Sequence, residues 1–330
     1  MKSKQENQTL KMLLAGFFAV SIIFFFTPFA VAHEAEPHPH DEESKAAEPH
    51  ASPEYKHDEH KSLGAIGKKL ANPLANLWAL NFNSFMPGFF DGDVNRGDAN
   101  LGATTIFQPI LPVPLFGEGK DELRVIVRPV VPLVWSTPIP RGNNDFYNKS
   151  GIGDIQLPFV FAVPASKAGK WILGAGPVFE FPTATTDDLG ADQWSLGPNL
   201  AIGHKGKNLT SVFFFNYFWK IGESGQDDMT PDTSKGTMLY SFQYALKNGW
   251  QIGTNPTISY NDKASSGNKW NVPVGPFIGR TIKIGGLPVN IKLGFEYSVV
   301  RPDDYGQQAA IRLQVTPIIA GLIKKPIFGK

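Results

Sequence analysis

The sequence predicts an all-β fold, an antiparallel transmembrane β-barrel of about 12 strands, on three observations. Apolar and polar positions alternate, so that in residues 250–262 Ile252 and Ile258 fall on one face and Gln251 and Asn255 on the other, as side chains in a strand do. The alternating segments run for about ten to fifteen residues, the length that crosses a bilayer at a tilt. Strands of soluble sandwiches average about five or six residues. Tryptophans mark both ends of the segments.

The strands expected from this alternation lie at about 76–86, 99–115, 122–135, 153–164, 171–184, 194–204, 209–222, 237–246, 250–263, 270–284, 288–301 and 307–319. Their connections alternate in length. The short ones are 117–121, 165–170, 205–208, 247–249 and 285–287, and the longer ones are 87–98, 136–151, 185–193, 223–236 and 263–269. Membrane barrels have short periplasmic turns, longer outer loops and an even strand number. The pattern therefore predicts that the chain enters and leaves the barrel on the periplasmic side.

Tryptophans occur at both ends of the expected strands, as they would at the two interfaces of a membrane. Indole rings prefer the headgroup level because they are apolar in body and polar at one edge. Some open strands at the short-turn end and others close strands at the long-loop end; the first group is Trp171 and Trp250, and the second is Trp135, Trp194, Trp219 and Trp270. A soluble sandwich would gather them in one core.

Proline is unusually frequent inside the expected strands. Proline has no backbone N–H to donate to a ladder, so it normally occurs at edges, bulges or strand ends. The positions concerned are Pro109, Pro112, Pro129, Pro132, Pro177, Pro198, Pro273 and Pro276. We expect local bulges there, or shorter strands than the alternation suggests.

Residues 1–32 are expected to be a signal peptide. Lys2, Lys4 and Lys11 precede an apolar run over 12–32, and Ala30 and Ala32 form a small-residue cleavage site. An uncleaved membrane anchor is the alternative, because the run is long enough to span. Cleavage removes three Lys and one Glu from 31 basic and 30 acidic residues, leaving 28 against 29. A nearly neutral mature chain argues against a nucleic-acid partner.

Residues 33–70 are expected to form a disordered periplasmic linker ahead of a barrel over 71–330. The segment 33–61 is rich in acids and prolines and has almost no large apolar side chain, so it cannot offset its chain entropy by burial. It also holds six of the seven histidines: His33, His38, His40, His50, His57 and His60. Imidazoles beside carboxylates suit zinc, copper or nickel, so weak divalent metal binding is one interpretation. A solvated spacer is the other, and no resident cofactor is expected.

The inward face of the predicted barrel carries the candidate pore-lining residues. They are Arg124, Arg128, Glu180, Gln251, Asn255, Lys292, Glu296 and Arg312. A barrel of about eight strands is filled by side chains and one of about sixteen holds an aqueous channel, so an intermediate size predicts a narrow or plugged passage. Lys292 and Glu296 share a face of one strand and could pair. The inward charges either satisfy one another in a closed interior or guide permeating solutes.

Sequence motifs of catalysis are missing, so we expect no enzyme. The chain has no cysteine, which excludes cysteine nucleophiles and thiolate metal sites. It contains neither a Gly-x-Ser-x-Gly elbow nor a His-Glu-x-x-His pair. His204 falls in a short turn, away from the outer rim where a hydrolase would need it.

Several blocks of sequence resemble a known bacterial group. They are NPLANL at 72–77, QPILP at 108–112, FPTAT at 181–185, SGNKWNVPVG at 266–275 and RPDDYG at 301–306. These blocks are similar to outer-membrane proteins related to the meta-pathway-of-phenol-degradation transporters, some of which carry the misleading label neuromedin U. The resemblance covers most of residues 70–325. It implies an outer-membrane barrel and passage of small aromatic or apolar compounds, and it supplies no catalytic residue.

Together these features predict a barrel of the bacterial outer membrane that transports or admits small organic compounds. The alternatives are a structural barrel without transport and a secreted, soluble β-sandwich that binds a ligand. The expected partners are outer-membrane lipid, small organic solutes and the barrel-assembly machinery, with no nucleic acid.

Overall fold

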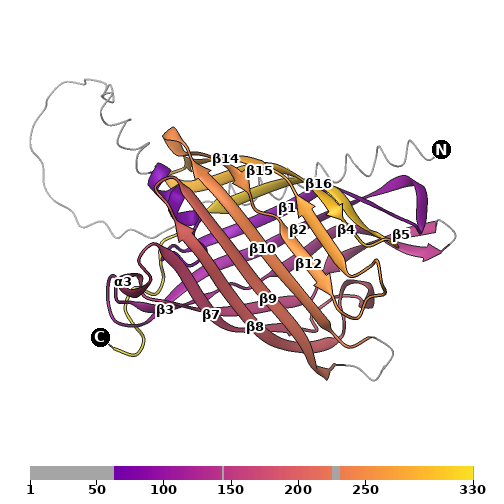
Figure 1. Cartoon of the computed structure of the whole chain (residues 1–330), viewed down its shortest axis with the longest axis horizontal. Coiled ribbons are helices and arrows are strands. Elements are labelled where there is room, and N and C mark those ends of the chain that lie inside the picture. The colour runs from indigo at the N-terminus through magenta and orange to yellow at the C-terminus, as the bar shows by residue number, and fades with distance from the viewer. Residues whose placement is uncertain (1–62, 143–144, 225–230, 330) are drawn as a thin grey trace, which may run out of the picture. The chain divides into compact units, whose positions relative to one another are not determined.

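The computed structural model describes residues 63–142, 145–224 and 231–329, in which antiparallel strands close into one barrel (Figure 1). The strands are β1 (Ala79–Gly92), β2 (Asn95–Phe116), β3 (Leu123–Val127), β4 (Val131–Gly142), β5 (Asp145–Ile152), β6 (Ile155–Ala162), β7 (Trp171–Phe181), β8 (Gln193–Lys205), β9 (Leu209–Glu223), β10 (Ser234–Ala245), β11 (Trp250–Thr254), β12 (Thr257–Asn261), β13 (Trp270–Val274), β14 (Phe277–Ile284), β15 (Leu287–Val300) and β16 (Gly306–Pro317). Residues 63–70 are helical, and α3 (Ala165–Ala168), η1 (Asp187–Leu189) and η2 (Lys247–Gly249) are single turns.

Closure is complete, because β1 pairs with β2 on one side and with β16 on the other. The pairs β3–β4, β5–β6, β11–β12 and β13–β14 each form one interrupted strand, so the barrel has 12 strands, as the sequence predicts. A two-sheet sandwich would leave sheet edges. The soluble-sandwich alternative is therefore wrong. Within the described residues, no helix has the length and apolar character needed to cross a membrane.

Proline accounts for some of the interruptions and not for others. Pro129 separates β3 from β4, and Pro256 separates β11 from β12, because neither can donate to the ladder. Pro177 and Pro198 instead face each other in an unshifted β7–β8 ladder. There the Asn199 side-chain amide donates to Pro177 O at 2.7 Å and Phe159 O at 3.2 Å. A side chain thus satisfies carbonyls that proline leaves unpaired.

Two of the expected outer loops are largely strand. The β1–β2 ladder continues to Gly92 opposite Asn95, and the β4–β5 ladder to Gly142 opposite Asp145. The predicted loops 87–98 and 136–151 are therefore wrong over most of their length. Bulges within these hairpins break the strict alternation on which the prediction relied. The hairpins project at the end of the barrel opposite α3 (Figure 1).

The two faces of the strands are assigned as the sequence predicts. On β15, Leu293 is 54% and Phe295 46% exposed, whereas Lys292 and Glu296 are buried. In a closed barrel the buried face is the interior, so the exposed apolar face points to the surroundings. The six tryptophans at the strand ends are all exposed on this outer face. An apolar outer face between aromatic girdles is typical of a membrane barrel.

The segments that precede β1 and follow β16 meet at the end with the short turns, called here the short-turn end. The backbone N–H of Ile319 donates to Trp78 O at 3.0 Å. Farther on, Ile327 and Phe328 donate to Pro114 O and Leu115 O at the end of β2, and the Phe328 ring stacks on Phe116. Entry and exit on one side agree with the prediction.

Candidate functional site

The interior near the short-turn end is filled by an apolar inner cluster. Its members are buried side chains from β3, β6, β7, β8 and β9 together with one residue that precedes the barrel: Leu74, Ile126, Val160, Ala162, Ile172, Ala201, Val212 and Phe214. The strand residues of this cluster line an apolar part of the barrel interior, called here the chamber. Leu74 fills it from a segment that belongs to no strand. This segment, residues 63–75, is called here the stopper, because it closes the chamber that the strands line.

The stopper continues into the helix at residues 63–70, which corrects the prediction that the linker extends to residue 70. A β-carbon at Gly67 would lie 2.2 Å from Gln251 Nε2 and 2.5 Å from Thr281 Oγ1, so the helix backbone lies directly against inward polar groups. A larger residue at position 67 would have to displace the Gln251 or Thr281 side chain. The Lys68 ammonium donates to Lys207 O in the β8–β9 turn. The helix therefore lies against the interior wall at the short-turn end.

The main charged group of the interior is the pair Arg312–Glu296. Arg312 Nη1 lies 2.7 Å from Glu296 Oε1, and both side chains are less than a tenth exposed. Arg312 Nε donates to Asn83 Oδ1 at 2.6 Å, and Nη1 also donates to Asn255 O at 2.9 Å. The guanidinium thus joins β1, β15, β16 and the β11–β12 connection. Such a fully bonded buried pair holds the interior rigid, and removing one partner would leave an uncompensated charge.

Lys292 does not pair with Glu296, contrary to one possibility raised by the sequence. Positions four apart along a strand are separated by about 13 Å, whereas Arg312 lies opposite Gly294, one diagonal step from Glu296. Lys292 Nζ instead donates to Gln243 Oε1 at 2.9 Å and lies 4.6 Å from the Phe277 ring centroid. Among the described residues it forms no ion pair. A buried ammonium with only neutral partners is costly.

A second charged cluster lies across the barrel. Glu180 on β7 is 2% exposed; its Oε2 lies 2.9 Å from Lys235 Nζ on β10, and its Oε1 accepts a bond from Gln156 at 2.9 Å. Two strands separate β7 from β10. The Lys235 side chain therefore reaches across the interior and narrows it.

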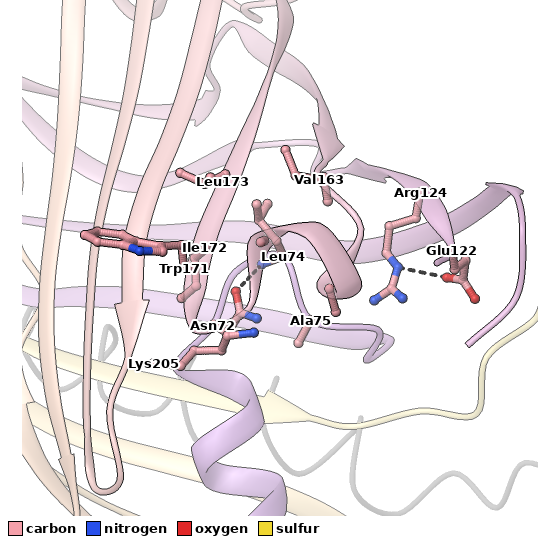
Figure 2. A pocket seen from close by; sticks show the side chains of 13 residues that line it. Asn72, Leu74, Ala75, Glu122, Arg124, Val163, Trp171, Ile172, Leu173 and Lys205 are labelled. Atoms are coloured by element: carbon pink, nitrogen blue, oxygen red, sulfur yellow. Dashed lines mark hydrogen bonds and ion pairs between the residues drawn. The ribbon is translucent and has the colours of Figure 1, made fainter. Parts of the chain in front are cut away.

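Arg124 and Arg128 share an inward face but occupy different surroundings. Arg128 donates to Gln108 Oε1 at 3.2 Å and lies 5.1 Å from the Phe214 ring centroid. Arg124 Nε lies 2.8 Å from Glu122 Oε1 at the rim. Figure 2 shows this rim pair beside the turn that carries Leu74. The two arginines therefore bind different partners and lie in different parts of the interior.

A small cavity lies between the stopper and the rim. Its volume is about 100 Å³, and its lining includes Asn72, Leu74, Ala75, Arg124 and Ile172 (Figure 2). That volume holds a few water molecules. Sites for organic ligands usually measure about 300–1,000 Å³. The cavity between the stopper and the barrel is therefore too small for such a ligand.

At the opposite end, a buried carboxylate anchors an outer loop. Asp154 accepts hydrogen bonds from the backbone N–H groups of Thr183 and Ala184, both at 3.1 Å, and of Ala191 at 2.8 Å. Charge-assisted bonds from both ends of a connection hold it in place. The loop between β7 and β8 is therefore fixed relative to the barrel mouth.

All eight predicted lining residues lie on the inward face, and the structure brings Asn255, Glu296 and Arg312 together. Gln251 and Lys292 approach the stopper side instead, through Thr281 and Gln243. Sequence reasoning missed Leu74, Phe214 and Lys235. The apolar spacing of Leu63, Ile66, Leu70 and Leu74 could have indicated the stopper, because it is helical.

No metal centre is built by the part of the chain that the structure describes, since no group of three or more potential ligands occurs there. The candidate ligands His33, His38, His40, His50, His57 and His60 lie outside the described residues. His204 on β8 packs edge-on against Trp171 at a centroid distance of 5.4 Å.

No protein-family model and no curated protein matches the sequence. Among solved structures, the chain is similar to the COG4313 outer membrane channel from Pseudomonas putida F1, with a TM-score of 0.52 and 14% identity over 74% of this chain and 96% of that one. More distant matches are the NanC porin (TM-score 0.44, 10% identity, 74% and 99% covered) and the Pseudomonas putida toluene transporter TodX (0.37, 8%, 76% and 92%). The first match shows a shared barrel fold.

Proposed function

We propose that this chain is a channel or transporter of the bacterial outer membrane that passes small organic solutes. The observation that carries the proposal is the apolar inner cluster, which the stopper completes from outside the strands through Leu74. A barrel with a purely structural role can fill its interior from its own wall. A chamber closed by a separate segment can be opened without disturbing the strand ladders.

The interior also suggests which solutes would pass. Ile126, Val160 and Phe214 offer an apolar surface, while Arg128 lies against the Phe214 ring as a polar neighbour. Ligand sites combine a mainly apolar lining with a few fixed polar groups. Small aromatic or apolar compounds fit that chemistry, and the resemblance to the phenol-pathway group points the same way. The lining residues Arg124, Glu180 and Arg312 would then set ion preference.

Planar-bilayer recordings test the proposal. The full chain is expected to show small or intermittent conductance, because the stopper occupies the chamber. Deleting residues 63–75 should give larger and steadier conductance. The matched control is a deletion of equal length at 40–52, which leaves the stopper in place and should conduct like the full chain.

A different result would favour the structural-barrel alternative. That alternative predicts no conductance for the full chain or for either deletion variant. It also predicts that liposomes containing the protein exclude small aromatic solutes. Heat-dependent gel migration verifies that each deletion variant forms a barrel before it is recorded.

We propose that residues 1–32 direct export and that the histidine-rich segment over 33–61 binds divalent metal weakly. The support is the composition of the segment. Calorimetry with zinc or nickel should show binding to the mature chain and none after deletion of 33–61. Unchanged affinity after the deletion would end the metal interpretation and leave a solvated spacer.

A further inference from the structure

In one stretch of the described barrel wall, called here the seam, two neighbouring strands form no backbone pairs over five successive rows. β11 pairs with β14 from Trp250 opposite Arg280 to Gly253 opposite Phe277. β12 pairs with β13 only at Ser259 opposite Asn271 and Tyr260 opposite Trp270. Between these ladders, the described residues 254–258 and 272–276 form no backbone pairs with each other.

The seam does not arise from a slip in register. Continuing the β11–β14 rows one residue at a time from Gly253 and Phe277 brings Ser259 opposite Asn271, as observed. The rows are therefore aligned across the seam and lack only their hydrogen bonds. Pro256, Pro273 and Pro276 lie within it, and each removes a donor. The prolines thus weaken this junction without displacing it.

Two side chains bind carbonyls of the seam, one from each face of the wall. Arg312 Nη1, in the interior, donates to Asn255 O at 2.9 Å. Tyr240, on β10, donates its hydroxyl to Pro273 O at 2.8 Å. Side-chain bonds exchange more readily than a ladder because each can be released singly. The seam is therefore held closed by the Arg312 and Tyr240 side-chain hydrogen bonds instead of a backbone ladder.

The surroundings of the seam favour an apolar cargo. On the outer face Val274, Phe295 and Phe242 are exposed, so a solute leaving there would enter hydrocarbon. At the short-turn end the stopper closes the straight path along the barrel axis. The seam is thus a weak place in the wall beside an interior whose axial exit is blocked.

We propose that the seam is a lateral exit, through which small apolar solutes pass from the barrel interior into the membrane. This inference rests on the proposed function. Release of the Tyr240 and Arg312 bonds separates the aligned rows, and their return closes the wall.

Cysteine crosslinking tests the exit in the full chain, which contains no native cysteine. Ile258→Cys with Val272→Cys places two thiols in the first unpaired row, since facing residues of antiparallel strands lie within disulfide range. The control pair, Ile252→Cys with Ile278→Cys, lies in the intact β11–β14 ladder on the same outer face. The readout is uptake of N-phenyl-1-naphthylamine, an apolar dye that fluoresces in hydrocarbon, by cells with a lipopolysaccharide outer leaflet.

Oxidation of the seam pair should abolish the protein-dependent uptake, and a reductant should restore it. Oxidation of the control pair should leave uptake unchanged. In addition, Tyr240→Phe should raise uptake by up to roughly fivefold, the population change that one net hydrogen bond represents. Tyr244→Phe, an exposed tyrosine on the same strand, serves as its control.

The outcomes separate the two proposals. Uptake by the wild type no greater than by cells without the protein contradicts the proposed function itself. If the oxidised seam variant still takes up the dye, and Tyr240→Phe leaves uptake unchanged, only the lateral exit is contradicted and an axial path remains.

Discussion

Replacing Glu296 by alanine is expected to lower the free energy of unfolding of the barrel by about 3–5 kcal/mol. The change leaves the Arg312 guanidinium in an interior site where it is 7% exposed, with its carboxylate partner gone. Its remaining acceptors, on Asn83, Asn255 and Gln314, are neutral. Neutral acceptors offset the desolvation of a cation less well than a carboxylate does, so most of the cost remains. Reversible urea unfolding in lipid vesicles measures it.

The matched control for Glu296 is an ion pair at the outer rim. Asp262 Oδ1 lies 3.7 Å from Lys269 Nζ, and both side chains are more than a third exposed. Asp262→Ala should change the unfolding free energy by less than about 1 kcal/mol. Similar losses in the two variants would mean that water reaches Glu296 and that the interior is open at that depth.

Replacing Leu293 by arginine should cost about 2–4 kcal/mol, because it places a cation against hydrocarbon. Leu293 lies midway along β15, opposite Ile278 on one side and Leu313 on the other, and its side chain is 54% exposed. The nearest charged side chain in the neighbouring outward rows, Arg280 opposite Ile291, is itself a cation, so the new charge gains no partner. Urea unfolding of the same vesicle preparation gives the comparison with the wild type.

Leu287→Arg provides the depth control on the same strand. Leu287 begins β15 at the short-turn end, where an arginine reaches the headgroups, so the expected cost is only about 0–1 kcal/mol. Equal costs at the two positions would contradict the placement of β15 across the membrane. A larger cost at Leu287 would require a different tilt or depth of the barrel.

Strand number and strand faces could be predicted because they depend on local patterns. Alternation along β9 places Phe213 and Phe215 outward without knowledge of any neighbour. The partners inside the barrel could not be predicted in the same way. Whether Glu296 binds Lys292 or Arg312 depends on the β15–β16 register, and register depends on turn geometry and bulges, which one sequence does not fix. The stopper was missed because residues 63–70 were assigned to the linker and Leu74 lay ahead of the first expected strand.

The residues after β16 give the junction between the first and last strands a second connection. Ile327 and Phe328 bind the end of β2 by their backbones, so the chain passes beyond β1 and fastens to the strand behind it. Two sets of backbone bonds therefore hold this junction: the β1–β16 ladder and the bonds from Ile327 and Phe328, which act as a strap. At the seam, by contrast, the described residues offer two side-chain bonds, from Arg312 and Tyr240, and no strap of backbone bonds. The first and last strands are therefore joined more firmly than the two strands at the seam.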